Sequence, residues 1–321
     1  MNILITGASG FVGKALSQKL KIYGNIIATD RECPTDGSNQ IKYQKVDIAN
    51  SNHVADLFKS NKPDIVIHCA GIAHQKIGSI DLENYLSVNS YATERIAKIA
   101  GLSNPDIHFI FLSSISVYGE NNNNAGPIIE NCECNPTSDY ACSKLDAEQR
   151  LVGLFEQGRL NKLDILRLAP VYDYEWSLNL ERRVLGPWKK FYIRFGLGNQ
   201  EMSAVSRQNL IAFIESLMTA NRKLGARHSN LYNVCDERSY SFNKIIEIFK
   251  SSKQHQDKPV LIIPLPIVWI LTRIGGLILK SKRSWLHSCY DKLAKDLVFD
   301  NTKMLMTGFK PIQTLKEVFD R

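Results

Sequence analysis

The stretch Thr6-Gly7-Ala8-Ser9-Gly10-Phe11-Val12-Gly13 decides the fold of this chain. It follows the apolar run Asn2–Thr6 and precedes a helical pattern over residues 11–20, so a strand, a glycine-rich turn and a helix come in direct succession. In such a unit the glycines allow a tight turn and a close approach of the backbone to a pyrophosphate, which the amide groups at the helix N-terminus bind. The stretch therefore predicts a dinucleotide-binding unit at the start of the chain.

Apolar, β-branched runs alternate with helical patterns through the first half of the chain, which favours βαβ units and a parallel sheet. The further strands are expected over Ile26–Thr29, Ile65–Cys69, Ile107–Leu112 and Leu163–Leu168, with helices over residues 85–100 and 140–155. After Pro170 this rhythm ends. We expect an α/β fold: a Rossmann-type, doubly wound parallel sheet over residues 1–170 and a smaller, interwoven substrate-binding lobe over residues 171–321.

Two aspartates follow apolar stretches of the first domain. Asp30 closes the second predicted strand, roughly twenty residues after the glycine-rich turn, where such folds place a carboxylate against the adenosine ribose. A carboxylate there repels a 2′-phosphate and favours NAD, whereas the adjacent Arg31 would accommodate that phosphate, so both cofactors stay open at this point. Asp47 is either an acceptor for the adenine amine or an ordinary loop or N-cap residue.

Tyr140 and Lys144 are four residues apart in a predicted helix and therefore share a face. A phenol has a pKa of about 10, and a neighbouring ammonium group lowers that pKa by stabilising the phenolate. Ser113 and Ser114 end the preceding strand, at the edge where open α/β sheets bind ligands. Ser113 fits a structural role, while Ser114 is placed to hold a substrate hydroxyl beside Tyr140. The set predicts proton transfer at a hydroxyl-bearing carbon.

The charge balance bears on the partners. The 321 residues include 40 Lys and Arg against 32 Asp and Glu, a formal net charge of +8 that suits an anionic ligand such as a dinucleotide or nucleotide sugar. Basic residues form only short clusters such as Lys280-Ser281-Lys282-Arg283, so no nucleic-acid partner is expected.

Neither the cysteines nor the histidines show the spacing of a metal site. The seven cysteines are odd in number and scattered, and His68, His74 and His228 stand apart from other ligand-type residues. We expect no metal, structural roles for these histidines, and a reduced, cytoplasmic chain without a signal peptide.

The most apolar stretch runs from Pro259 to Leu279. It contains Arg273, Gly275-Gly276 and two prolines, a combination that a membrane span of about 20 residues rarely tolerates. We expect a strand over residues 260–263 and an amphipathic helix over residues 267–279, packed on the core or on a partner. Peripheral contact of that helix with a membrane surface stays open as an alternative.

Taken in order, the motifs resemble the extended short-chain dehydrogenase/reductase family, in particular its nucleotide-sugar epimerases and dehydratases of the UDP-glucose 4-epimerase type. The matching motifs are T-G-x-x-G-x-x-G at Thr6–Gly13, V-I-H-x-A at Val66–Ala70, S-S-x-S-V-Y-G at Ser113–Gly119, Y-x-x-x-K at Tyr140–Lys144 and L-R-x-x-x-V-Y at Leu166–Tyr172. The stretches Phe299–Lys303 and Thr307–Pro311 are similar to the family's closing signatures, so the resemblance covers nearly the whole chain.

The resemblance implies a role for individual residues. It makes Ser114, Tyr140 and Lys144 the catalytic trio. The positions expected to line the cofactor are Gly7, Gly10, Phe11, Val12, Gly13, Asp30, Arg31, Asp47, Ile48, Ala70, Gly71, Asn89, Tyr140 and Lys144, with Pro170 and Val171 beside the nicotinamide. It also implies a homodimer formed through the helices around residues 84–100 and 140–155.

The chain departs from the family pattern where substrate chemistry is decided. Ile115 and Ser116 replace the Asp-Glu pair that dehydratases carry after the serine or threonine, so the acid and base for water loss are missing. The arginine that usually binds the diphosphate is displaced. The substrate-binding candidates are Ser116, Asn179, Arg182, Arg183 and Arg207.

The resemblance and these departures together favour NAD-dependent epimerisation at C4 of a UDP-sugar through a 4-keto intermediate. One alternative uses the same trio in an NAD(P)H-dependent 4-keto reductase of a nucleotide-linked deoxysugar. Another is a non-catalytic dinucleotide-sensing or scaffold protein, which the complete trio argues against, because a sensor needs the glycines but not the base.

Overall fold

The computed structural model describes residues 1–32, 41, 43–73, 80–119, 126–224, 227–279 and 283–320. The chain forms two compact units, each assembled from segments far apart in sequence. Unit 1 comprises residues 1–119, 133–167 and 213–232, and unit 2 comprises residues 120–132, 168–212 and 233–321. The expected boundary between residues 170 and 171 stays a prediction.

Unit 1 is built on a seven-stranded sheet whose strands follow the order β11-β6-β5-β4-β1-β2-β3. The strands are β1 (Asn2–Thr6), β2 (Asn25–Asp30), β3 (Tyr43–Lys45), β4 (Ile65–His68), β5 (His108–Ser114), β6 (Lys162–Leu168) and β11 (His228–Val234). Neighbours from β3 to β5 pair in parallel. The chain turns to one side of β1 for β2 and to the other for β4, which confirms the doubly wound topology and opens the ligand-binding edge at the carboxyl end of β1.

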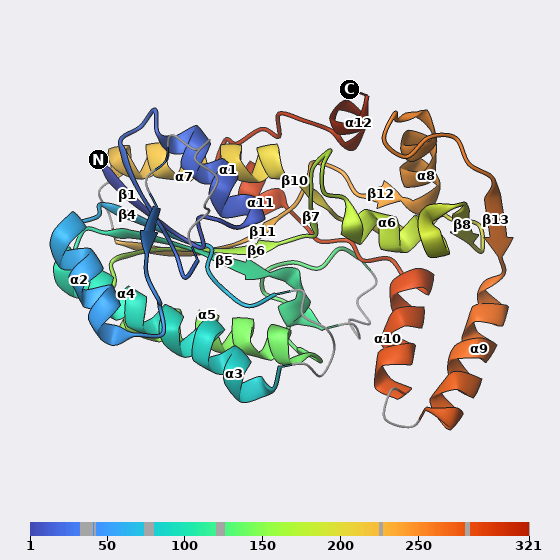
Figure 1. The fold of residues 1–321 in the computed structure, drawn as a ribbon, viewed down its shortest axis with the longest axis horizontal. Coiled ribbons are helices and arrows are strands. Elements are labelled where there is room, and N and C mark those ends of the chain that lie inside the picture. Colours follow the sequence, from blue (N-terminus) through green and yellow to red (C-terminus); the bar gives the residue numbers. More distant parts are fainter. Residues whose placement is uncertain are drawn as a thin grey trace. The chain divides into compact units, whose positions relative to one another are not determined.

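Helices cover both faces of this sheet, as Figure 1 shows, with α1 and α7 on one face and α2, α4 and α5 on the other. The helices are α1 (Phe11–Leu20), α2 (Ser51–Asn61), α3 (Leu82–Leu86), α4 (Ala92–Ser103), α5 (Asp139–Glu156) and α7 (Arg207–Leu224). A π-helical turn (Ser87–Tyr91) joins α3 to α4, and a 3-10 turn (Ile115–Tyr118) follows β5. Both faces of the central strands are therefore buried, which explains why these strands are continuous apolar runs in the sequence.

Unit 2 combines short strand pairs with helices. The pairs are β7 (Val171–Tyr172) with β10 (Val205–Ser206), β9 (Glu201–Met202) with β12 (Tyr240–Ser241), and β8 (Tyr192–Phe195) with β13 (Val260–Ile263). The helices are α6 (Leu178–Val184), α8 (Phe242–Ser251), α9 (Leu265–Ile278), α10 (Arg283–Ala294), α11 (Thr302–Leu305) and α12 (Leu315–Phe319). Buried Asp236 organises the centre of the unit, because it accepts hydrogen bonds from the Tyr172 and Tyr240 hydroxyls at 2.7 and 2.8 Å and from the Asn209 amide at 2.6 Å.

The apolar stretch after Pro259 forms β13 and α9, as expected from the sequence. Packing of this helix on the core is not what the structure shows, since Gly276 is its single buried residue. Among the described residues, no helix is both long and apolar enough to cross a membrane.

Candidate active site

The glycine-rich turn after β1 leaves no room for side chains. Gly7 has a φ of +65°, and a Cβ there would lie 2.7 Å from the Ala70 amide nitrogen. A Cβ on Gly13 would lie 2.2 Å from the Gly7 carbonyl oxygen, and one on Gly10 would lie 3.2 Å from the same oxygen. Gly10 is the N-cap of α1 and provides no side-chain acceptor for the first amides of the helix. The cradle therefore fits the pyrophosphate of a dinucleotide, with Phe11 and Val12 half-buried in the first helical turn.

Asp30 is held at the end of β2 by the same turn. Its carboxylate accepts hydrogen bonds from the Ser9 amide at 3.0 Å and from the Ser9 hydroxyl at 2.5 Å. Arg31 is turned the other way, with a 76% exposed side chain lying 4.0 Å from Glu32. The fixed negative charge thus belongs to Asp30, which favours a ribose with a free 2′-hydroxyl over a 2′-phosphate.

Asp47 and Ile48 lie beyond β3. The Asp47 carboxylate accepts from the Ala49 amide at 2.9 Å and so stabilises its own turn, the local role that the sequence left open. Ile48 is half-buried against the sheet's hydrophobic core, and its carbonyl oxygen accepts from Arg95 at 3.4 Å. A contact of either residue with adenine stays a prediction.

The loop after β4 carries Ala70 and Gly71, and Asn89 fixes it. Asn89 lies fully buried in the π-helical turn; its Oδ1 accepts from the Ile72 amide at 2.7 Å, and its Nδ2 donates to the Ile72 carbonyl at 3.1 Å. The same Nδ2 donates to the Ser143 hydroxyl on α5 at 3.0 Å. Asn89, a predicted cofactor position, therefore positions this loop against α5, and π-helical turns are frequent at functional sites.

Ser114 and Tyr140 are brought together at the carboxyl end of β5. The Ser114 hydroxyl is hydrogen-bonded to the Tyr140 side chain. Ser116 joins them, because its amide and hydroxyl lie 3.2 and 2.8 Å from the Ser114 oxygen. Burial raises the pKa of Tyr140, and the hydrogen bond with Ser114 opposes that rise. The sequence predicted that Lys144 lowers this pKa; in the structure, removal of the ring from water has the largest effect and raises it.

Lys144 is buried one helical turn from Tyr140. Its ammonium group donates to the Leu112 carbonyl oxygen at 2.9 Å and lies 4.7 Å from the centre of the Phe111 ring. Burial lowers the pKa of Lys144 to about 8, so the group is mostly a cation at neutral pH. A Cβ placed on Gly71 would lie 3.5 Å from this nitrogen, so the loop after β4 passes directly beside the cation.

A buried ion pair stabilises α5, the helix that carries Tyr140 and Lys144. Glu148, one turn after Lys144, pairs with Arg167 at 2.7 Å and accepts a hydrogen bond from Ser113. Arg167 also lies over the Tyr118 ring, 4.6 Å from its centre. Ser113 therefore has the structural role expected from the sequence.

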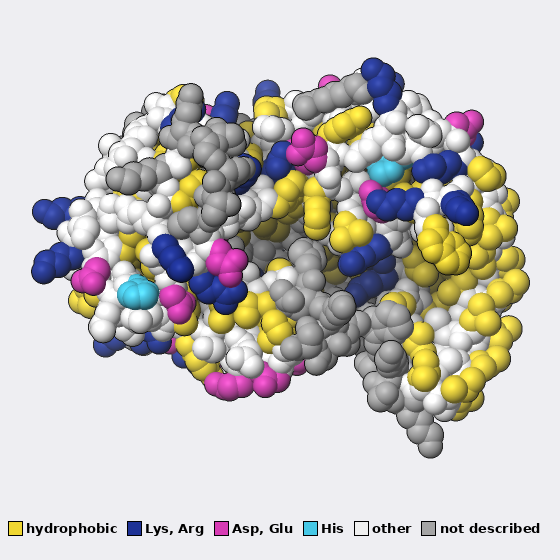
Figure 2. All heavy atoms as spheres, in the orientation of Figure 1, with side chains coloured by type: hydrophobic (Ala, Val, Ile, Leu, Met, Phe, Trp, Pro, Cys, Tyr) yellow, Lys and Arg dark blue, Asp and Glu magenta, His cyan; other side chains and the backbone are white. Residues whose placement is uncertain are grey.

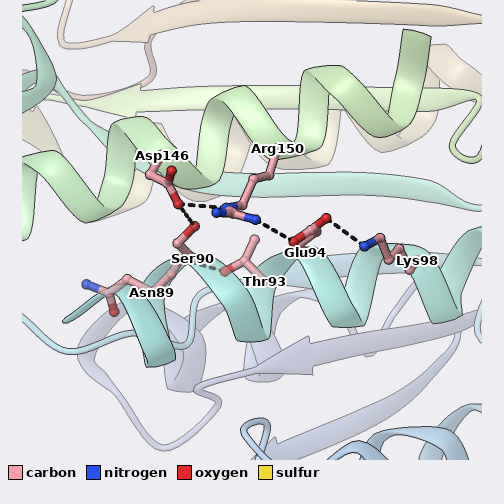
Figure 3. A network of polar contacts seen from close by, with 7 residues as sticks. All are labelled: Asn89, Ser90, Thr93, Glu94, Lys98, Asp146 and Arg150. Carbon is pink, nitrogen blue, oxygen red and sulfur yellow. Dashed lines mark hydrogen bonds and ion pairs between the residues drawn. The ribbon is translucent and has the colours of Figure 1, made fainter. Parts of the chain in front are cut away.

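A second polar network ties α4 to α5 at their surface. Figure 3 shows Arg150 of α5 between Asp146 at 2.7 Å and Glu94 of α4 at 2.9 Å, with Lys98 on the far side of Glu94. Ser90 donates to Asp146 on the other side. The helices expected to form a dimer interface thus carry charged groups on their outer faces, together with half-buried apolar residues.

The candidate residues of unit 2 have mixed surroundings. Pro170 and Val171 precede and begin β7. Arg207 forms a 2.6 Å ion pair with Asp173, and Arg183 donates to the Lys292 carbonyl of α10 at 3.0 Å. Arg182 is exposed and Asn179 is half-buried in α6. Since Asp173 neutralises Arg207, Arg182 presents the more accessible positive charge.

Unit 2 also has a pocket of about 390 Å³ between residues 201–203, 235–239 and 298–301. Its lining includes the carboxylates of Glu201, Asp236, Glu237 and Asp300 against one arginine, Arg238. These carboxylates repel a diphosphate, so this pocket does not suit the nucleotide.

The histidines have structural roles, as expected, for the two that the structure describes; His74 lies outside the described residues. His68 is fully buried between the hydroxyls of Thr6 at 2.7 Å and Thr93 at 2.8 Å, and burial lowers its pKa to about 3. His228 lies 3.7 Å from buried Asp164, which also contacts His108 at 2.7 Å.

Burial alone would raise the pKa of Asp164, but the two imidazoles outweigh it and lower that pKa. The sequence spacing did not reveal this trio of metal-ligand types, because the three residues come from three different strands; in the structure their ligand atoms lie within 4.8 Å of one another.

Sequence reasoning missed two groups at the site. Ser143 anchors Asn89, and Tyr85 packs edge-on against the Tyr140 ring with 6.4 Å between centres. Asn89, the partner of Ser143, lies in a π-helical turn that the residue pattern did not predict.

The comparisons with known proteins agree with this geometry. A model of the NAD dependent epimerase/dehydratase family matches residues 3–183. The chain is 28% identical to a UDP-glucose 4-epimerase of Vibrio cholerae over 99% of its own length and 93% of the relative, and 27% identical to a dTDP-glucose 4,6-dehydratase of Haemophilus influenzae over 45% and 48%. Its fold is similar to that of Thermotoga maritima UDP-glucose 4-epimerase solved with UDP-glucose, at a TM-score of 0.75, 20% identity and coverage of 100% and 96%.

Proposed function

Because the chain belongs to the NAD-dependent epimerase/dehydratase family, we propose that it inverts C4 of a nucleotide sugar, with UDP as the nucleotide, through a 4-keto intermediate. The observation that carries this proposal is the placement of Ser114 at the carboxyl end of β5 beside Tyr140, with the Lys144 cation one helical turn further along α5. The similarity to UDP-glucose 4-epimerases over nearly the full length supports the choice of reaction.

The residues present fit NAD. The glycine cradle has no room for a Cβ, Asp30 is fixed at the ribose position, and the Lys144 ammonium lies beside the Gly71 loop. When bound, NAD supplies the acceptor and donor of the hydride.

The chain's own residues move the proton. Ser114 holds the substrate C4 oxygen next to the Tyr140 phenol oxygen, and the phenolate form of Tyr140 accepts the hydroxyl proton. Lys144 stabilises that phenolate by its positive charge. Burial favours the protonated phenol. This protonated form returns the proton to the C4 oxygen of the keto sugar, so Tyr140 ends the cycle in the protonation state in which it began.

Two features argue against the neighbouring reactions of the family. Ile115 and Ser116 follow Ser114 in a 3-10 turn, and neither carries a carboxyl group for water loss. A biosynthetic 4-keto reductase needs reduced cofactor in every cycle and usually takes NADPH, which the fixed carboxylate of Asp30 disfavours.

The remaining assignments are part of the same proposal. Arg182 contacts the diphosphate, with Arg183, Arg207, Asn179 and Ser116 as further substrate contacts. The protein is a homodimer through α4 and α5 in the cytoplasm. Light scattering at micromolar concentration tests the dimer, and a monomeric mass contradicts it.

The test of the reaction needs no added reductant. The protein is incubated with UDP-glucose, UDP-galactose and their N-acetyl forms, and the products are followed by NMR. Interconversion of C4 epimers at constant absorbance of NADH is the expected result. If no UDP-sugar is converted, while a 4-keto sugar is reduced with stoichiometric loss of NADH or NADPH, the protein is a reductase instead.

A further inference from the structure

The helix α9 exposes an unusual amount of apolar surface. Leu271, Leu277 and Ile278 are 62%, 68% and 74% exposed. The other exposed large apolar residues of this segment are Ile267, Trp269, Ile270, Ile274 and Leu279. Figure 2 shows hydrophobic side chains gathered over α9 and β13, where Leu261 and Ile262 are also about half exposed. Contiguous patches of this kind mark an interaction surface, because monomeric proteins in water rarely leave them open.

The face of α9 that carries its glycines is the face that packs against the rest of unit 2. A Cβ on Gly275 would contact Leu286 of α10 at 3.2 Å, and one on Gly276 would contact Arg283 at 3.1 Å. Glycines allow α10 to approach closely, while the bulky residues are left on the other sides of the helix. Figure 1 shows the two helices as a hairpin that extends away from α6 and α8 of the same unit. Nothing in the described part of unit 2 covers the bulky face.

The charged residues in the sequence around the patch are all basic. From Lys258 to Tyr290 the sequence has five basic residues and no acidic one. In the sequence, Lys280 and Lys282 follow the last residues of α9, and Arg283 begins α10. Arg273 is the one charged residue of α9, and its guanidinium lies 5.2 Å from the centre of the Trp269 ring. An apolar face, an interfacial tryptophan and flanking cations match the acyl chains and anionic headgroups of a lipid surface.

We propose that α9 docks in the plane of an anionic membrane, with its bulky face among the acyl chains and the neighbouring basic side chains among the headgroups. Its 14 residues span about 21 Å, too short for a bilayer core of about 30 Å, so the helix lies on the membrane instead of crossing it. A second copy of the chain fits less well, because a two-fold interface would bring two copies of this positively charged segment together.

Vesicle sedimentation tests this proposal. The full-length protein is mixed with vesicles of phosphatidylcholine alone or with a large share of phosphatidylglycerol. We expect strong binding to the anionic vesicles, weak binding to the neutral ones, and a decrease as salt rises from 0.1 to 0.5 M, because salt screens the headgroup attraction. On binding, Trp269 moves into an apolar layer, so the fluorescence shifts to shorter wavelength, and the shift shrinks in Trp269→Phe.

Matched variants separate the patch from general surface hydrophobicity. Leu271→Glu combined with Leu277→Glu should lower the partition coefficient about 100-fold or more, since two leucines no longer enter the acyl region. Ile22→Glu combined with Met306→Glu makes an equivalent change at residues outside the patch that are 68% and 81% exposed, and should bind like wild type. Equal midpoints of thermal unfolding establish that both variants fold.

Three results would overturn the proposal. Wild type could stay in the supernatant with both lipids, or the Leu271/Leu277 variant could sediment as wild type does. In the third result, the wild-type protein does not bind vesicles but forms an oligomer, and the Leu271/Leu277 variant does not form it. The patch is then an interface between copies of the chain.

Discussion

His68 makes the stability of this protein depend on pH, and the size of the effect follows from its burial. The imidazole lies at the end of β4 between the Thr6 and Thr93 hydroxyls and is fully buried. The Thr6 hydroxyl also lies 3.3 Å from the Ala70 amide, so His68 stabilises the strand ends that form the cofactor loop. Burial, assisted by the Lys144 charge, lowers its pKa from 6.5 to about 3.

The sign and magnitude follow from proton linkage. Between pH 6.5 and about 3 the unfolded chain protonates this imidazole and the folded chain does not, so stability falls as the pH falls through that window. pH 5.0 lies about 1.5 units below the unfolded-state pKa of 6.5. At 1.36 kcal/mol per unit, protonation of the unfolded chain therefore lowers the free energy of unfolding by about 2 kcal/mol at this pH. At pH 7.5 the contribution is close to zero.

Urea unfolding of wild type and His68→Gln at pH 7.5 and 5.0 measures this contribution. The variant is expected to be less stable at both values, because the hydroxyl partners are disturbed, but its loss between the two should be about 2 kcal/mol smaller. Replacing the exposed His53 by Gln is the matched control and should leave the wild-type loss unchanged. If His68→Gln loses as much free energy of unfolding as wild type between these pH values, His68 is not the neutral buried group described above.

Three further predictions concern the site. Tyr140→Phe should reduce turnover about 10²–10⁴-fold with NAD affinity nearly unchanged, and retention of more than half of the turnover would contradict the proton-transfer role. Gly13→Ala should destabilise the protein by about 3 kcal/mol or abolish folding, since its Cβ would lie 2.2 Å from the Gly7 carbonyl oxygen. Gly153→Ala is the matched control: its Cβ would meet no atom within 4 Å, so it should stabilise α5 by about 0.5–1 kcal/mol. Titration with both cofactors should show tighter binding of NAD than of NADP, and the reverse would mean that Arg31 outweighs Asp30.

Local spacing explains why much of the fold and site was predictable. The strand–turn–helix at Thr6–Gly13 and the pairing of Tyr140 with Lys144 each lie within a few residues, so backbone geometry alone defines them. The order of motifs along the chain then indicates the family. The same logic failed for the pKa of Tyr140, which was expected to fall and instead rises, because desolvation depends on everything packed around the ring.

The sequence by itself determined the dinucleotide-binding topology, and it predicted the trio Ser114, Tyr140 and Lys144 and the acidic residue at the ribose position, since each depends on contiguous or helically spaced residues. Only the tertiary structure decided what surrounds them. Asn89 positions the cofactor loop through Ile72 and Ser143, 17 and 54 residues away in the sequence. Arg207 is neutralised by Asp173, and α9 meets α10 with its glycines and leaves its bulky face open. Burial, pairing and exposure arise from contacts between distant segments, and no local pattern of side chains encodes them.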